Sequence, residues 1–232
     1  SGGALPSGWA ATTATGVEGG GSFSPSHISF SQGVMQMNVT QDGTTAGSVG
    51  AEVEYNQLFG YGTYSWSMQA AGTSATQGGS GSAVSGQISS TFQYSGGNPS
   101  PTEIDSPEIE GQFPTQIEWT TWLNGIRSDF HQTTLANPQN TYHIYKYIWA
   151  PGSIGFYLDG SLIWTSTTNV PTAPAHPIAN LWGTNSTSFG GLATAGVTRY
   201  MYINAFSYSN CGSLSASHTA SGTPVTYTAP AI

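Results

Sequence analysis

Apolar and polar residues alternate with a period of two along many short stretches of the chain. A period of two places successive side chains on opposite faces of a β-strand, so each stretch predicts a strand with one buried face. No amphipathic pattern of helical period extends over ten residues. The predicted strands cover residues 27–30, 34–39, 61–68, 87–94, 116–122, 142–149, 154–158 and 201–208.

Turn residues separate these stretches. Pro151-Gly152 and Asp159-Gly160 enclose one predicted strand, which indicates a pair of hairpins. Residues 71–84 are rich in Gly, Ser and Thr and are expected to form a mobile loop. Strands at this spacing predict an all-β fold, a two-sheet antiparallel β-sandwich, with residues 1–232 forming a single domain.

Composition supports strands and excludes some partners. The chain has 31 glycines, 12 tyrosines and 7 tryptophans, which suit strands joined by tight turns. Only 6% of its residues are charged, and the three basic ones are Arg127, Lys146 and Arg199, so nucleic acid and anionic membranes are not expected as partners. No apolar run is long enough to span a membrane. The single cysteine, Cys211, excludes an internal disulfide.

Acidic residues are concentrated in one segment. Glu103, Asp105, Glu108 and Glu110 fall within eight positions. In a strand, residues 103 and 105 share a face, and residue 108 joins that face only if one extra residue bulges out. Proline cannot donate to a strand ladder, so Ser106-Pro107 marks the expected position of the bulge.

Three carboxyl groups on one sheet face cannot all ionise freely, so at least one pKa is expected to rise. An acid beside a base is what glycoside cleavage requires, and a retaining hydrolase places two carboxyls about 5–5.5 Å apart. Two other interpretations fit the spacing equally well, namely a solvated acidic edge and a calcium site.

Several segments resemble one known family. Glu103-Ile-Asp-Ser-Pro-Glu108 is similar to the catalytic signature Glu-x-Asp-x-(x)-Glu of glycoside hydrolase family 16, in its bulged form. Residues 142–160 follow the family's His, Trp, Pro, Phe-Tyr-x-Asp-Gly hairpin, and Asn180-Leu-Trp182 is similar to its Asn-Leu-Trp strand. Residues 50–64 look like a strand-turn-strand segment of lichenases. These matches follow the family's order.

The resemblance implies a concanavalin-like β-jelly roll and a lichenase- or laminarinase-like, retaining endo-β-glucanase. Such an enzyme would cleave β-1,3-, β-1,4- or mixed-linkage glucan through a covalent glycosyl-enzyme intermediate. By position, Glu103 would be the nucleophile, Glu108 the acid/base, and Asp105 the residue that orients the nucleophile. No metal or cofactor is expected for catalysis, although many relatives carry one structural calcium.

Sugar rings stack on aromatic side chains, which makes Phe92, Trp119, Trp122 and Trp182 candidate sugar platforms. Strand alternation makes Trp119 and Trp122 face opposite ways.

The resemblance also implies that Glu52 and Asn180 form hydrogen bonds with sugar hydroxyl groups. The chain departs from lichenases in three binding positions. Glu54 replaces an arginine, residues 98–102 stand where a tryptophan usually precedes the signature, and Phe189 stands in place of a later cleft tryptophan.

Three functions follow from these patterns. Hydrolysis of a β-glucan is favoured, a transglycosylase acting on β-glucan or xyloglucan would use the same carboxylates, and a non-catalytic glucan-binding relative would have lost turnover. In each case the partner is a polysaccharide. The protein is expected to be secreted, with its signal peptide removed, and to act as a monomer.

Overall fold

The computed structural model describes residues 4–17, 20–96, 101–210 and 226–228, so Cys211 lies outside the described residues. The described part consists of strands and loops plus one short 3-10 helix, Pro25–His27. None of its helices is long or apolar enough to cross a membrane.

One sheet carries the acidic segment. Its strands lie in the order β11 (Ile126–Thr134), β10 (Gln116–Leu123), β9 (Thr102–Glu110), β8 (Gln87–Ser95), β15 (His176–Gly183), β6 (Val49–Tyr55), β3 (Ser22–Phe23) and β2 (Ala14–Thr15), and β1 (Trp9–Ala11) also pairs with β6.

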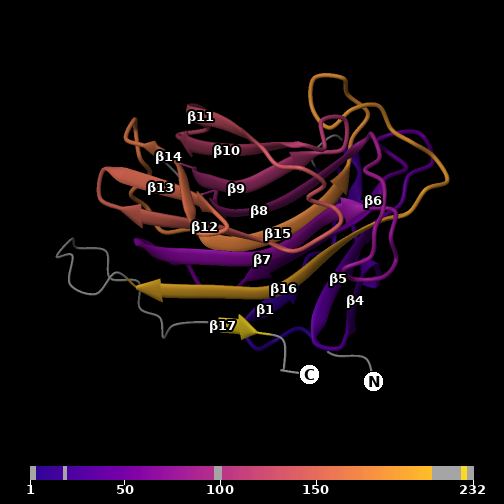
Figure 1. Cartoon of the computed structure of the whole chain (residues 1–232), viewed down its shortest axis with the longest axis horizontal. Coiled ribbons are helices and arrows are strands. Elements are labelled where there is room, and N and C mark those ends of the chain that lie inside the picture. The colour runs from indigo at the N-terminus through magenta and orange to yellow at the C-terminus, as the bar shows by residue number, and fades with distance from the viewer. Residues whose placement is uncertain (1–3, 18–19, 97–100, 211–225, 229–232) are drawn as a thin grey trace.

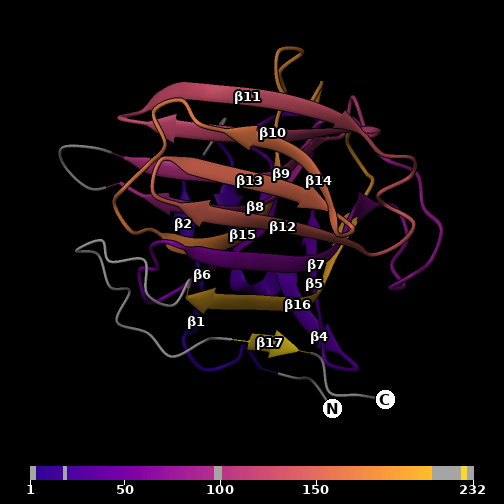
Figure 2. The same cartoon turned by 60° about the vertical axis from the view of Figure 1, so that its left-hand side comes forward.

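The second sheet packs against the first. Its order is β14 (Ser161–Ser166), β13 (Ser153–Leu158), β12 (His143–Ala150), β7 (Gly62–Gly72), β16 (Arg199–Asn210), β5 (Val34–Val39) and β4 (Ile28–Ser31), with β17 (Thr226–Thr228) beside β16. Figures 1 and 2 show the two curved layers from two sides. Every pairing is antiparallel except that of β3 with β6. The predicted all-β sandwich is therefore confirmed.

The core lies between the sheets and is built by alternation. On β9, Ile104 and Ile109 face inward, while the acidic side chains between them face the other way. Trp119 of β10 packs against Tyr145 and Phe156 of the second sheet, at centroid distances of 6.1 and 5.7 Å. The first sheet thus has one face in the core and one face available for a site.

All eight predicted strands are present, with ends shifted by a few residues. The predicted hairpins are also confirmed: Asp159 and Gly160 both have positive φ, 49° and 86°, as a tight two-residue turn requires. The predicted start of the loop at residue 71 is wrong, because β7 continues to Gly72 through pairing with β16. Its mobility stays a prediction.

Candidate active site

Strand β9 contains the bulge that the sequence predicts. Glu108 lies opposite Ser90 on β8 and Glu118 on β10, whereas Asp105 lies opposite Phe92 and Thr120. The neighbouring strands advance by two residues while β9 advances by three. One extra residue is therefore accommodated at Ser106-Pro107, and Glu108 returns to the face of Glu103 and Asp105.

Side chains of β8 stabilise the bulge. A bulge leaves main-chain carbonyls without ladder partners, and buried carbonyls need hydrogen bonds. The Thr91 hydroxyl donates to the Ser106 carbonyl oxygen at 2.6 Å, and the Ser90 hydroxyl donates to the Pro107 carbonyl oxygen at 3.2 Å. These bonds hold the strand in the form that aligns the carboxylates.

The aligned carboxylates line a cleft of about 890 Å³ on the outer face of the first sheet. Arg127 is the single basic residue in its lining, and its guanidinium lies 4.7 Å from the Phe130 ring centroid. The cleft receives seven of the chain's eleven acidic residues: Glu52, Glu54, Glu103, Asp105, Glu108, Glu110 and Glu118.

Asp105 is the most buried of the three signature carboxylates, with 1% of its surface exposed. Burial raises its pKa well above the usual value, and the nearby charges of Glu108 and Glu103 raise it further. The Trp122 indole Nε1–H donates to Asp105 Oδ2 at 2.8 Å, which opposes this rise by stabilising the charged form. The expectation that one pKa in the cluster rises is confirmed.

Glu118 is a cleft residue that the sequence reasoning missed. Its carboxylate accepts a hydrogen bond from Gln132 Nε2 at 2.7 Å, and burial raises its pKa. The sequence did contain a signal for Glu118: it lies four residues before Trp122 on the same strand, so the two side chains share a face.

The sequence model of the family described as glycosyl hydrolases family 16 matches residues 19–199, which is most of the chain. The chain belongs to glycosyl hydrolases family 16. The resemblance seen in the acidic signature is therefore confirmed over both sheets.

Curated relatives of family 16 include bacterial proteins named beta-glucanase. The chain is 34% identical over 132 residues to one from Bacillus amyloliquefaciens, covering 54% of this chain and 49% of the relative. It is 29% identical over 163 residues to one from Acetivibrio thermocellus, covering 68% and 45%. The chain thus spans about half the length of the curated relatives it matches.

Solved structures of family members share the fold over nearly the whole chain. The Bacillus licheniformis beta-glucanase superposes with a TM-score of 0.75 at 25% identity, covering 89% of this chain and 94% of that one. The catalytic domain of an endo-1,3-beta-glucanase (laminarinase) from Thermotoga petrophila has a TM-score of 0.71 at 15% identity, covering 91% and 95%. The second likeness shows the fold alone.

Five of the six predicted substrate-binding residues line the cleft. Glu52 and Asn180 lie on neighbouring strands, and Asn180 Nδ2 donates to Glu52 Oε2 at 3.2 Å. Burial raises the pKa of Glu52. The aromatic members of this set in the cleft are Phe92, Trp122 and Trp182.

The prediction that Trp119 forms a sugar platform is wrong. Its side chain has no exposed surface and lies in the core, where its indole Nε1–H donates to Thr133 Oγ1 at 3.2 Å. A ring that is fully enclosed cannot present a face to a sugar. Trp122, three residues on, takes the cleft position that alternation offers.

Two of the three positions that depart from lichenases, Glu54 and Phe189, also lie in the cleft, whereas residues 98–100 of the third lie outside the described residues. Phe189 packs beside Trp182 with ring centroids 5.9 Å apart, so it extends the aromatic surface at that end. Glu54 adds a carboxylate on β6. Within the described residues, no three His, Cys, Asp or Glu side chains gather closely enough to hold a metal ion. A structural calcium stays a prediction.

Proposed function

We propose that this protein is a retaining endo-β-glucanase that hydrolyses β-1,3-, β-1,4- or mixed-linkage glucan. The observation that carries the proposal is the bulge in β9, which brings Glu103, Asp105 and Glu108 to one face of a cleft. Membership of family 16 and similarity to proteins named beta-glucanase support the same activity.

The chemistry needs only carboxyl groups. Glu103 attacks the anomeric carbon and forms a covalent glycosyl-enzyme, while Glu108 donates a proton to the leaving oxygen and then takes one from the attacking water. Asp105, anchored by Trp122, lies between them along the strand and orients the nucleophile. A protonated Asp105, which its raised pKa favours, would avoid a second negative charge beside Glu103 while Glu108 carries its proton.

The cleft suits a neutral chain of sugars. Carboxylates and Asn180 offer hydrogen-bond acceptors for hydroxyl groups, and the rings of Phe92, Trp122 and Trp182 offer faces for apolar sugar surfaces. Because this lining extends across six strands from β11 to β6, several sugar units can bind side by side, as an endo-acting enzyme requires.

The test is release of reducing sugar from barley mixed-linkage glucan, laminarin, xyloglucan, cellulose and agarose, with Glu103→Gln as the blank. Release from a β-glucan that is absent in the variant is the expected result, and NMR of the first product should show the β-anomer. Transfer of glycosyl units to added oligosaccharide in place of hydrolysis would indicate a transglycosylase. Binding without turnover would indicate a glucan-binding protein.

We also propose that the protein is secreted and acts as a monomer. A glucan polymer cannot enter a cell intact, so an endo-acting hydrolase is useful outside it. Activity in the culture medium of the source cells, and light scattering on the purified protein at the mass of one chain, are the expected results. Activity retained in washed cells would contradict secretion.

A further inference from the structure

Glu110 is the member of the acidic cluster to which the proposed chemistry gives no task. It follows Glu108 by two residues on β9, so it shares the cleft face, and 6% of its surface is exposed. A carboxylate this buried is unfavourable without hydrogen-bond donors. Its partners therefore indicate what it does.

Both donors to Glu110 reach the same oxygen, Oε2. One is the side-chain amide Nε2–H of Gln112, and the other is the backbone N–H of Gly190. Gly190 belongs to the loop of residues 184–198, which joins β15 to β16 and rises at the upper right in Figure 1. Glu110 thus connects the strand of the catalytic carboxylates to a loop far along the sequence.

That loop supplies part of the cleft wall. Ser188 and Phe189 line the cleft, and Phe189 lies beside Trp182 with an angle of 46° between the two rings. The residue that Glu110 holds is the one directly after Phe189. A shift of the Gly190 peptide therefore moves the Phe189 ring.

Only glycine fits at position 190. Its φ is +81°, and a Cβ there would lie 2.2 Å from Thr184 Cγ2 and 2.8 Å from Ile88 Cδ1. Its carbonyl accepts from the Gly86 N–H at 2.9 Å while its N–H donates to Glu110. Both polar groups of this residue are fixed, which defines the position of the preceding side chain.

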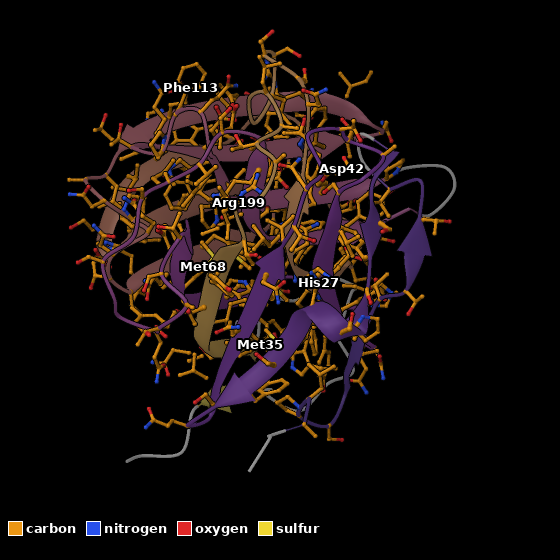
Figure 3. All side chains as sticks on the ribbon, turned by 90° about the vertical axis from the view of Figure 1, so that its right-hand side faces the viewer. His27, Met35, Asp42, Met68, Phe113 and Arg199 are labelled. Atoms are coloured by element: carbon orange, nitrogen blue, oxygen red, sulfur yellow. The ribbon has the colours of Figure 1, made fainter. Side chains whose placement is uncertain are left out.

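The other end of the loop has a separate anchor. Arg199 has no exposed surface and donates to the carbonyl oxygens of Val197 and Thr194, at 2.9 and 3.3 Å, and to Gln41 Oε1. Figure 3 shows Arg199 well inside the outline of the molecule. This anchor holds residues 194–197. At the cleft end of the loop, Glu110 acts together with the Gly86 N–H and with the Thr184 hydroxyl, which donates to the Phe189 carbonyl oxygen at 3.1 Å.

The contact has an electrostatic cost. The charge of Glu110 contributes to the raised pKa of Glu118 on the adjacent strand. An apolar residue at position 110 would avoid this repulsion and the burial of a charge, but it would leave the Gly190 N–H without its acceptor.

We propose that Glu110 is a positioning residue that fixes Phe189 beside Trp182 and thereby sets the affinity of the cleft for the apolar face of a glucose unit. The glucose part of this inference rests on the proposed β-glucanase function. Glu110 itself does not touch the reacting atoms.

The first test compares Glu110→Leu with Glu110→Gln on the β-glucan that the wild type cleaves best. Leucine removes the acceptor, and the KM should rise roughly three- to tenfold, the scale of one displaced aromatic contact, while kcat stays unchanged. Glutamine keeps an acceptor oxygen and should restore the wild-type KM. Glu110→Ala, which admits water to the Gly190 amide, should repeat the leucine result if the leucine variant folds poorly. A fall in kcat at constant KM would overturn the inference.

The second test couples Glu110 to Phe189. Phe189→Ala should raise the KM by a similar factor, and Glu110→Leu should add nothing further in that background. The double variant should therefore bind like either single variant. Additive losses would overturn the inference, because they would mean that Glu110 acts on substrate by another route.

The third test needs no catalysis and separates this inference from the proposed function. Amide hydrogen exchange over residues 186–191 should accelerate in Glu110→Leu and stay at the wild-type rate in Glu54→Leu, which removes a cleft carboxylate that does not contact the loop. If exchange accelerates in Glu110→Leu but the wild type cleaves no glucan, the proposed function alone is rejected. Unchanged exchange in Glu110→Leu would reject the positioning role.

Discussion

The bulge in β9 predicts how deletions in this strand change the face on which each carboxylate lies. Side chains in a strand repeat their direction every two residues. Deleting Pro107 alone gives the order Glu-Ile-Asp-Ser-Glu, in which all three carboxylates share one face without a bulge. Deleting both Ser106 and Pro107 places the second glutamate three positions after the first, so it faces the core.

The size of the effect follows from what each face holds. In the double deletion, Ile109, which is 4% exposed, turns outward at a cost of roughly 1.5–3 kcal/mol, and Glu108 and Glu110 turn toward the core at a cost of several kcal/mol each. If the chain folds in spite of this, the cleft lacks its acid/base, and the rate should fall about 10²- to 10⁴-fold.

Both deletion variants should be assayed by reducing-sugar release on the preferred glucan and by thermal melting followed with circular dichroism. The single deletion should retain measurable hydrolysis, although it loses the hydrogen bond from Ser90 to the Pro107 carbonyl. The double deletion should be inactive and less stable. A double deletion as active as the single one would refute the argument that alternation along β9 places Glu108 in the cleft as the acid/base.

Three further predictions concern the same sheet. Trp122→Phe removes the indole N–H that donates to Asp105, so kcat should fall about 10- to 100-fold with the fold intact, measured by steady-state kinetics; an unchanged kcat would contradict the positioning of Asp105. Asp105→Asn should melt at a higher temperature than the wild type at pH 7, and this difference should disappear near pH 3. The sign follows from the raised pKa of Asp105 in the folded protein. Stability is lost as the pH rises above 3.8, the pKa of the unfolded carboxyl, toward the higher pKa of the folded one, whereas the amide of asparagine does not titrate. Trp119→Phe should lower the free energy of unfolding by roughly 1–3 kcal/mol, measured by urea denaturation, and leave the KM unchanged, since the indole lies in the core against Thr133.

Local pattern was sufficient to predict eight of the strands and the sheet face that carries the acidic signature. Alternation and the proline at position 107 predicted the place of the bulge from the sequence alone, because both are properties of a single strand. The same alternation separated Trp119 from Trp122 but could not say which one faces the cleft. That choice depends on which face of β10 the second sheet covers, and only the packing of Tyr145 and Phe156 against Trp119 decides it.

Features that depend on distant segments were not predictable from the sequence. Strand β11 was missed because it lies at the edge of the sheet and all of its residues are exposed or half-buried, so its apolar periodicity is weak. The burial of Arg199 has no local signal, because the carbonyl groups that solvate it come from residues 85, 86, 194 and 197. The contact between Glu110 and Gly190 spans 80 positions and is likewise visible only in the fold.

The charge of the cleft determines the class of polymer that it can hold. Seven carboxylates line it, and the one cation in the lining, Arg127, already lies over the Phe130 ring. A sulfated or uronic acid chain would bring its negative charges next to these carboxylates, and charges of the same sign at a half-buried site repel each other. A neutral glucan brings hydroxyl protons instead, and ionised carboxylates accept hydrogen bonds without donating any. We therefore expect the carboxylates of the cleft to serve both the proposed cleavage chemistry and the exclusion of charged polysaccharides.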